Sequence, residues 1–256
     1  MPLPPPPIPP EPGHVPSERE LREDLAAAYR LIALHGMTDL VFTHLSARVP
    51  GEGHRFLVNP YGLLFEEVTA SSLVLVDAAG EPAQPTPWPV NPAGFVIHSA
   101  VHLGRADAQC VMHTHTLAGM AVAAQTGGLL PLNQISMEFS GRVALHDYEG
   151  IAAEDNLAER ERLVRDLGDR SCMILRHHGL LTLGRSVAEA FYRMWYLDQS
   201  CRIQLAAQGS GAPLAIPSRG LVERARAQFE AGPETAWLPW QALRRKLDRE
   251  QPDYRE

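Results

Sequence analysis

Apolar residues recur at helical spacing near both ends of the central part of the chain. Ser17 and Glu20 form a capping-box pattern. The apolar positions that follow it are Leu21, Leu25, Ala28 and Ile32. Their spacing predicts an amphipathic helix, which Gly36 can end. A second capping-box pattern, Ser186 and Glu189, precedes a longer predicted helix. Its apolar face holds Val187, Phe191, Met194, Leu197, Cys201 and Leu205.

Short apolar runs between these two helices predict strands. They lie at residues 43–49, 55–59, 73–76, 109–113, 172–176 and 180–183. Further helices are expected at residues 94–104, 117–125 and 154–167. Residues 81–92 are rich in proline and should form a loop, whereas residues 129–150 give no clear pattern. Because strands and helices alternate, we expect an α/β fold in which helices cover a sheet.

The two ends of the chain differ from this central part. Residues 1–16 are mostly proline, which favours a disordered or polyproline II arm. The folded domain is expected at residues 17–215, and residues 216–256 are expected to be a helical extension. Trp237 and Trp240 lie close together in that extension, and exposed tryptophans often mark interfaces. We therefore expect the extension to contribute to a subunit interface.

Composition excludes several classes of partner. The formal net charge is −7, which argues against nucleic acid because phosphate binding needs a basic face. No apolar run approaches the roughly 20 residues of a membrane helix, and the start does not have the pattern of a signal peptide. The cysteines Cys110, Cys172 and Cys201 are widely spaced in apolar stretches, typical of small core residues. These features favour a cytoplasmic protein whose main partner is not nucleic acid.

Histidines at two places suggest a metal site. His113 and His115 flank Thr114 at the end of a predicted strand, so both side chains point to one side. By itself such a pair fits a structural role equally well. The second element is the segment Ile174-Leu-Arg-His-His-Gly179, in which glycine permits a tight turn at a strand end. Three neutral imidazoles with open positions are typical of a catalytic metal shell.

The segments Val111-Met-His-Thr-His-Thr116 and Leu175-Arg-His-His-Gly-Leu180 together resemble the class II aldolase/adducin family, over about residues 20–210. The resemblance implies a single-domain α/β/α sandwich with a central mixed, largely antiparallel sheet. It implies one divalent metal ion per chain, with zinc favoured and iron, manganese or cobalt as alternatives. The implied ligands are His113, His115 and His178. It also implies a homotetramer with sites near subunit boundaries.

One departure from the family concerns the acid/base group. Its sugar-phosphate aldolases carry a glutamate four residues before a histidine, and that position here is Gly94, four residues before His98. Because a positioned base contributes about 10²–10⁴-fold in rate, we do not expect an ordinary sugar-phosphate aldolase. The residues that could replace the glutamate are Glu138, His98, His177 and Tyr148.

A second departure concerns the substrate. The family's Gly-Asn-x-Ser-x-Arg motif is here Thr43-His-Leu-Ser-Ala-Arg48, and its second phosphate segment is Pro60-Tyr-Gly62. The implied substrate contacts are His44, Ser46, Arg48 and Gly62. Loss of Gly-Asn removes a close backbone approach to phosphate. A carboxylate is therefore as consistent with the motif as a sugar phosphate.

Three functions remain open at this point. The first is a metal-dependent lyase that acts on a small hydroxy or keto carbonyl compound by aldol cleavage or decarboxylation. The second is a non-heme-iron oxygenase that acts on a keto acid. The third is a non-catalytic interaction module, because residues 59–73, 91–98 and 144–150 are similar to the adducin head domain. Actin binding is not expected, because adducin's long tail and basic terminal segment are lacking.

Overall fold

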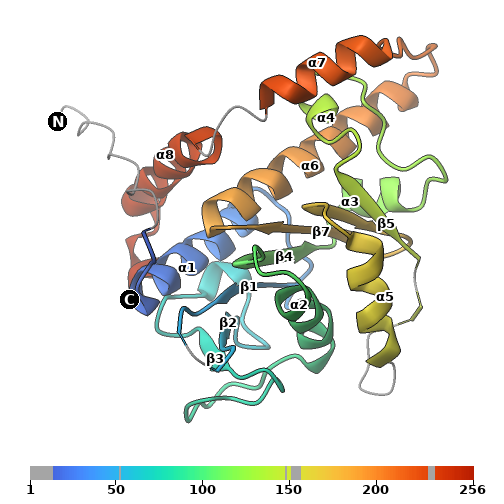
Figure 1. Ribbon diagram of the computed structural model, residues 1–256. Helices are drawn as coiled ribbons and strands as arrows, with labels where there is room; N and C mark the ends of the chain where they lie inside the picture. Colours follow the sequence, from blue (N-terminus) through green and yellow to red (C-terminus); the bar gives the residue numbers. More distant parts are fainter. Residues whose placement is uncertain (1–13, 52, 148, 151–156, 230–233) are drawn as a thin grey trace.

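The computed structural model describes residues 14–51, 53–147, 149–150, 157–229 and 234–256. Within these ranges a seven-stranded sheet has the strand order β3-β2-β1-β4-β7-β6-β5 (Figure 1). The strands are β1 (His44–Arg48), β2 (Phe56–Val58), β3 (Val74–Val76), β4 (Cys110–Thr114), β5 (Val143–His146), β6 (Cys172–Leu175) and β7 (Gly179–Gly184). Only β5 and β6 pair in parallel, and the other neighbours are antiparallel. The expected mixed, largely antiparallel sheet is thus confirmed.

Helices cover both faces of this sheet (Figure 1). One face carries α1 (Glu18–Leu34), α3 (Leu117–Ala123), α6 (Val187–Gly209) and α8 (Glu234–Glu250), whereas α2 (Pro92–Gly104) and α5 (Leu157–Leu167) cover the other. Strand β4 shows why two cores form. Cys110 and Met112 belong to the core beneath α1 and α6, whereas Val111 belongs to the core beneath α2 and α5. Alternating side chains on a strand that is buried on both sides produce this division.

The two capping patterns begin their helices in different ways. At α1 the box is complete, because Ser17 accepts from the backbone of Glu20 and the Glu20 carboxylate accepts from the backbone of Ser17. At α6 the Ser186 hydroxyl accepts from the Glu189 amide at 3.2 Å. The Glu189 carboxylate instead accepts from the Arg185 amide at 2.6 Å. The reciprocal bond of the second box is therefore replaced by one to the preceding residue.

Residues 129–150, which gave no pattern, contain α4 (Gln134–Glu138) and β5. Both elements are short, with five and four residues, so neither shows a full period of apolar positions. Strand β5 is also the edge of the sheet, and its Leu145 is 41% exposed. The first residues of the helix expected at 154–167 lie outside the described residues, as do residues 1–13 of the proline-rich arm.

The C-terminal residues form α7 (Arg219–Phe229), α8 and a short 3-10 helix, η2 (Pro252–Arg255). Trp240 of α8 is 1% exposed, and its ring lies 5.6 Å from that of Phe191. The expectation that Trp240 is an exposed interface residue is therefore wrong, because it packs inside its own chain. The Arg30–Asp253 ion pair, at 2.7 Å, joins α1 to η2. The interface role of residues 216–256 stays a prediction.

Among the described residues, no helix has both the length and the apolar character needed to cross a membrane.

Candidate metal centre

Three histidines from separate turns of the chain meet at one end of the sheet. His113 is the second-to-last residue of β4, His115 directly follows that strand, and His178 lies in the turn between β6 and β7. Their candidate ligand atoms all lie within 4.8 Å of one another. Gly179 permits this approach, because a Cβ there would stand 2.5 Å from the Thr114 carbonyl oxygen. Strand pairing between β4 and β7 therefore brings the two histidine motifs together.

The backbone fixes the orientation of the His113 ring. Its Nδ1 lies 2.9 Å from the carbonyl oxygen of Leu180, and His113 is 1% exposed. A carbonyl can only accept, so Nδ1 carries the proton and Nε2 keeps its lone pair. Burial holds the pKa of His113 well below its ordinary value, which keeps the ring neutral.

A carboxylate holds the second ring in the same way. The Nδ1 of His115 lies 2.8 Å from Oδ2 of Asp39, so in the neutral ring the proton is on Nδ1 and the lone pair is on Nε2. Sequence reasoning missed Asp39, because it lies 76 positions before His115 and in no motif. The loop around it is unusual, since Leu40 and Thr43 both have positive φ, at 50° and 68°. These conformations are uncommon for residues other than glycine, and here they present Asp39 to the histidine.

The facing nitrogens of His113 and His115 fit a cation. Their two Nε2 atoms are 2.9 Å apart. With both protons on Nδ1, two lone pairs point toward the same small volume. Two such lone pairs repel each other, and a divalent ion bound by both nitrogens would remove that repulsion. His178 supplies a third nitrogen, and burial lowers its pKa to about 4, so it is also neutral near pH 7. This donor set suits zinc or another transition metal.

Two of the expected acid/base residues lie away from this cluster. His177 is exposed, with φ of +57°, and its amide donates to the Ala123 carbonyl at 3.2 Å. Glu138 ends α4 and accepts from the Tyr192 hydroxyl at 3.3 Å. Burial raises the pKa of Glu138, and its charge acts on Cys172 at the opposite end of β6 from His178. Within one chain, the structure therefore does not bring Glu138 to the histidines. Tyr148 lies outside the described residues.

The side chains of Ser46 and Arg48, both expected to contact the substrate, are engaged with α2 in this chain, and their contact with substrate stays a prediction. Ser46 is fully buried, and its hydroxyl lies 2.8 Å from Nε2 of His102 and also contacts Nδ1 of His98. The Arg48 guanidinium donates to the carbonyl of His102, in the last turn of α2. It therefore satisfies a carbonyl group at the C-terminus of a helix.

His44, at the start of β1, stands beside the cluster. Its ring centroid is 5.4 Å from that of His113, and its Nδ1 is 2.8 Å from Nε2 of His98. Burial lowers the pKa of His44 to about 3. Gly62 has φ of +108° in the turn after β2. The register that pairs Ser46 with Val58 places that turn at the same end of the sheet as His44.

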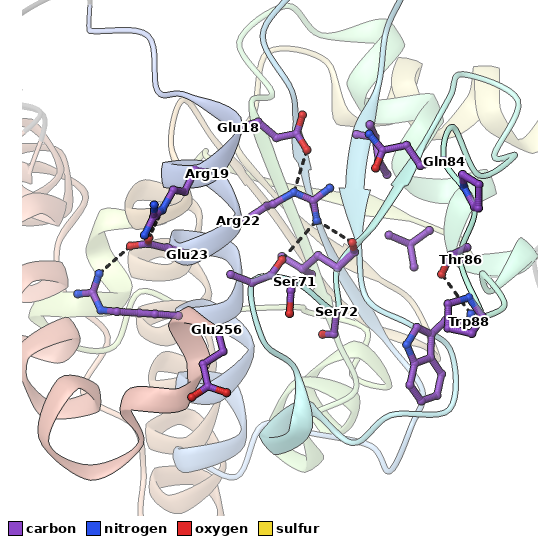
Figure 2. Close-up of a pocket in the computed structure, with 17 residues that line it drawn as sticks. Glu18, Arg19, Arg22, Glu23, Ser71, Ser72, Gln84, Thr86, Trp88 and Glu256 are labelled. Carbon is purple, nitrogen blue, oxygen red and sulfur yellow. Dashed lines mark hydrogen bonds and ion pairs between the residues drawn. The ribbon is translucent and has the colours of Figure 1, made fainter.

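A cleft of about 650 Å³ lies elsewhere, along the edge strand β3 and the start of α1 (Figure 2). Several of its charged groups are paired with one another or with the backbone. Arg22 binds Glu18 at 2.8 Å and the Leu73 carbonyl at 2.8 Å, and Arg19 binds Glu23 at 3.2 Å. Because β3 is three strands from β4, this cleft is not part of the histidine site.

Known proteins share this fold and much of this sequence. The model for the class II aldolase and adducin N-terminal domain matches residues 23–205. Alpha-adducin of Rattus norvegicus is 44% identical over 77% of this chain, a region that is 27% of adducin. A solved aldolase II superfamily protein from Pseudomonas syringae is 53% identical, with a TM-score of 0.89 over 95% of this chain and 98% of its own. The L-fuculose 1-phosphate aldolase of Glaciozyma antarctica PI12 is 28% identical, with a TM-score of 0.84 over 96% and 97%. The chain belongs to the class II aldolase and adducin N-terminal domain family.

Proposed function

We propose that the protein is a divalent-metal-dependent lyase that makes or cleaves a carbon–carbon bond next to the carbonyl of a small hydroxy or keto compound. The observation that carries the proposal is the pair of Nε2 atoms of His113 and His115, 2.9 Å apart. Both rings have Nδ1 engaged elsewhere, so both lone pairs are available to one ion. Membership of a family that includes a solved L-fuculose 1-phosphate aldolase supports a lyase.

His113, His115 and His178 would hold the ion. Zinc is the first candidate for an imidazole-only shell, and iron, manganese and cobalt are alternatives. When bound, such an ion acts as a Lewis acid on a carbonyl oxygen. The chain's residues supply neutral imidazoles and hold them in register. Asp39 and the Leu180 carbonyl fix the His115 and His113 rings. The His115 side chain is 20% exposed, so a small substrate can reach this side of the cluster.

The reaction is not expected to follow the ordinary sugar-phosphate aldolase pattern. Gly94 has no side chain to transfer a proton, and the ring of His44 occupies the space beside it. The substrate class is a small hydroxy carbonyl compound, and a sugar or sugar phosphate stays within it. We further propose a homotetramer in which another subunit borders this site. Leu40 and Phe42 support this assembly, because they are 70% and 44% exposed beside Asp39.

A non-catalytic module like the head of adducin is the second candidate. The 44% identity with rat alpha-adducin favours it, because so close a relationship extends over 200 residues. On this alternative the histidines would bind a metal without turnover. An oxygenase acting on a keto acid would use the same three imidazoles with iron, and only its requirement for oxygen distinguishes it from a lyase.

One experiment tests these functions together. Purified protein is analysed for metal by mass spectrometry, then assayed as isolated, chelated and reloaded with zinc, iron, manganese or cobalt. The panel is L-fuculose 1-phosphate, L-rhamnulose 1-phosphate and aryl and alkyl 2-keto acids, each with and without oxygen. We expect about one ion per chain and metal-dependent cleavage that needs no oxygen. Oxygen consumption would support the oxygenase, and bound metal with no turnover would support the module. Failure to bind any of these metals would overturn the proposal.

A further inference from the structure

We propose that His44 is the proton-transfer group that faces the substrate at this site, and that His98, Ser46 and His102 fix its proton on Nδ1. The inference rests on the proposed function and extends it. It assigns to the first residue of β1 the acid/base role for which sequence reasoning considered Glu138, His98, His177 and Tyr148.

Two regular elements place these side chains against one another. Positions 44 and 46 of β1 alternate with Leu45 and Ala47, which belong to the opposite core. Positions 94, 98 and 102 of α2 are four residues apart and share one helix face. The strand therefore sets His44 and Ser46 against Gly94, His98 and His102. The contacts are His44 with His98, and Ser46 with both His98 and His102.

These contacts form a row of hydrogen bonds that runs from the Ala108 carbonyl through His102, Ser46 and His98 to His44. The Ala108 carbonyl at its inner end determines which atom donates in every bond. Nδ1 of His102 lies 2.8 Å from the Ala108 carbonyl oxygen, which can only accept. In a neutral ring Nε2 of His102 must then accept, so the Ser46 hydroxyl donates to it at 2.8 Å. The Ser46 oxygen is left to accept from Nδ1 of His98.

The outer end of the row is fixed by the same argument. Because Nδ1 of His98 donates, its Nε2 accepts from Nδ1 of His44 at 2.8 Å. The proton of a neutral His44 ring is thereby held on Nδ1, and Nε2 carries a lone pair. Among the described residues, no hydrogen bond reaches Nε2 of His44. Burial of His98 and His102 lowers the pKa of each ring, which supports their neutral forms.

Gly94 is what leaves room for this base. A Cβ built on Gly94 would stand 2.2 Å from Cδ2 and 2.4 Å from Nε2 of His44. Real side chains do not approach that closely, so the ring of His44 fills the volume that a side chain at position 94 would need. The histidine at position 44 can therefore adopt this position only because residue 94 has no side chain. The candidate base comes from strand β1 and not from helix α2.

His44 is near the three metal-binding histidines without being one of them. The centroid of the His44 ring lies 5.4 Å from that of His113. The group of histidines whose candidate ligand atoms lie within 4.8 Å of one another consists of His113, His115 and His178, and it does not include His44. A group at this distance can contact a substrate that is bound beside the cluster. It is also close enough that a role as a metal ligand must be excluded by experiment.

The proposed step is the removal of a proton from carbon next to a carbonyl. The Nε2 lone pair of His44 forms the new N–H bond while the C–H bond breaks. The C–H electron pair becomes the carbon–carbon double bond, and the carbonyl π pair moves onto oxygen. The products are an enolate and an imidazolium, and return of the proton restores both reactants. Neither oxidant nor reductant is required.

The first test needs neither metal nor substrate. In the metal-free protein labelled with ¹⁵N at the histidine rings, we expect the His44 spectrum to show Nδ1 protonated and Nε2 unprotonated. Ser46→Ala removes the link between His98 and His102 and should yield mixed tautomers at His44. A native spectrum with the proton of His44 on Nε2 would overturn the proposal.

The second test separates the base from a ligand. His44→Asn places an amide nitrogen near the Nδ1 position, so it can still donate to His98, but it has no Nε2. We expect bound zinc to stay at the native level while deuterium exchange falls about 10²–10⁴-fold. Exchange is followed by NMR in deuterated buffer with dihydroxyacetone phosphate and with pyruvate. Added imidazole should restore part of the rate in His44→Ala, and the exposed His54→Ala serves as the matched control.

Each remaining outcome has a definite meaning. Loss of zinc in His44→Asn would make His44 a ligand and overturn the proposal. Unchanged exchange in that variant would overturn it as well, as would absence of exchange with both probes in the zinc-loaded native protein. A native protein that binds no metal would instead overturn the proposed function, and the tautomer of His44 could still be read from the metal-free spectrum.

Discussion

Oδ2 of Asp39 accepts a hydrogen bond from Nδ1 of His115 at 2.8 Å. A carboxylate in this position fixes the ring, and it strengthens the other nitrogen as a ligand. We expect Asp39→Asn to weaken zinc affinity roughly 10–100-fold. The fold should persist, because the Asp39 side chain is 40% exposed. Competition with a chelator gives the affinity, and the exposed Asp169→Asn is the control. Equal affinities for both variants would show that Asp39 does not support the site.

The ligand assignment itself predicts the effect of removing one imidazole. His115→Ala should leave the sheet intact, because this residue follows β4 and takes no part in strand pairing. Bound metal should fall well below one ion per chain, since only two imidazoles remain. Metal analysis and circular dichroism of the same sample decide the matter. An occupancy equal to that of the native protein would mean that the shell is assigned wrongly.

The contact between position 94 and His44 predicts a pair of coupled substitutions. Gly94→Ala places a Cβ 2.2 Å from the His44 ring, so the ring or helix α2 must move. We expect a loss of about 1–3 kcal/mol in the free energy of unfolding, as for other overpacked cores. In the His44→Ala background the ring is absent, so adding Gly94→Ala should cost little. The double variant should therefore have nearly the same free energy of unfolding as His44→Ala alone. Urea unfolding of the four proteins measures the coupling, and strict additivity would contradict the contact.

The same contact changes what a restored glutamate can do. From the sequence, Gly94→Glu should return a carboxylate to the site at some cost in packing. The structure adds that the new side chain must first displace His44. We therefore expect Gly94→Glu to show at most weak cleavage of L-fuculose 1-phosphate or L-rhamnulose 1-phosphate, and the native protein little. Rates of order 1–10³ s⁻¹ for the native protein, which are typical of enzymes, would refute this reading.

Local patterns predicted the parts of the site that lie within motifs. Strand alternation and a glycine turn drew attention to the two histidine segments, and the family resemblance then implied His113, His115 and His178 as the ligands. Asp39 was missed because a tertiary contact places it, through a loop with positive φ at Leu40. Sequence similarly could not show that Ser46 is buried under α2, because that depends on the separation of strand and helix.

The fold shows the same division between local and tertiary information. The capped helix α1 was predicted closely, because its apolar spacing and Ser17 act locally. Strand β5 was not, because an exposed edge strand of four residues lacks a distinct pattern. Trp240 was expected on the surface, and it packs instead on Phe191 of α6, a contact between distant segments that composition does not reveal.

Assembly can be tested at the exposed start of α3. Leu117 follows the histidine cluster by two residues and is 82% exposed in the isolated chain. If another subunit covers this end of the sheet, Leu117→Asp should lower the mass measured by light scattering below that of a tetramer. The fold should be unaffected, because this side chain makes little contact with its own chain. A native protein that is monomeric at micromolar concentration would contradict the proposed tetramer.

The buried histidine row also predicts how stability depends on pH. Burial lowers the pKa of His102 from 6.5 to about 3, and the guanidinium of Arg48 adds to this shift. Between these values the unfolded chain binds a proton that the folded chain does not. Stability is therefore complete above pH 6.5 and is lost as the pH falls, by about 1.4 kcal/mol per pH unit for this ring. Buried His98 and His44 act in the same direction.

A window between pH 5.5 and 6.5 separates the histidines from carboxyl groups with lowered pKa, such as that of Asp107, which lose their contribution only at more acidic pH. Urea midpoints of the metal-free protein should fall across the window. His102→Asn removes one titrating ring, while its amide can still donate to the Ala108 carbonyl. Its slope should be shallower by up to about 1.4 kcal/mol per pH unit, whereas the exposed His54→Ala should keep the native slope. If His102→Asn and His54→Ala gave equal slopes, His102 would have to be charged or solvated in the folded protein. A neutral His102 with its proton on Nδ1 would then no longer determine which atoms donate in the hydrogen bonds between Ala108 and His44.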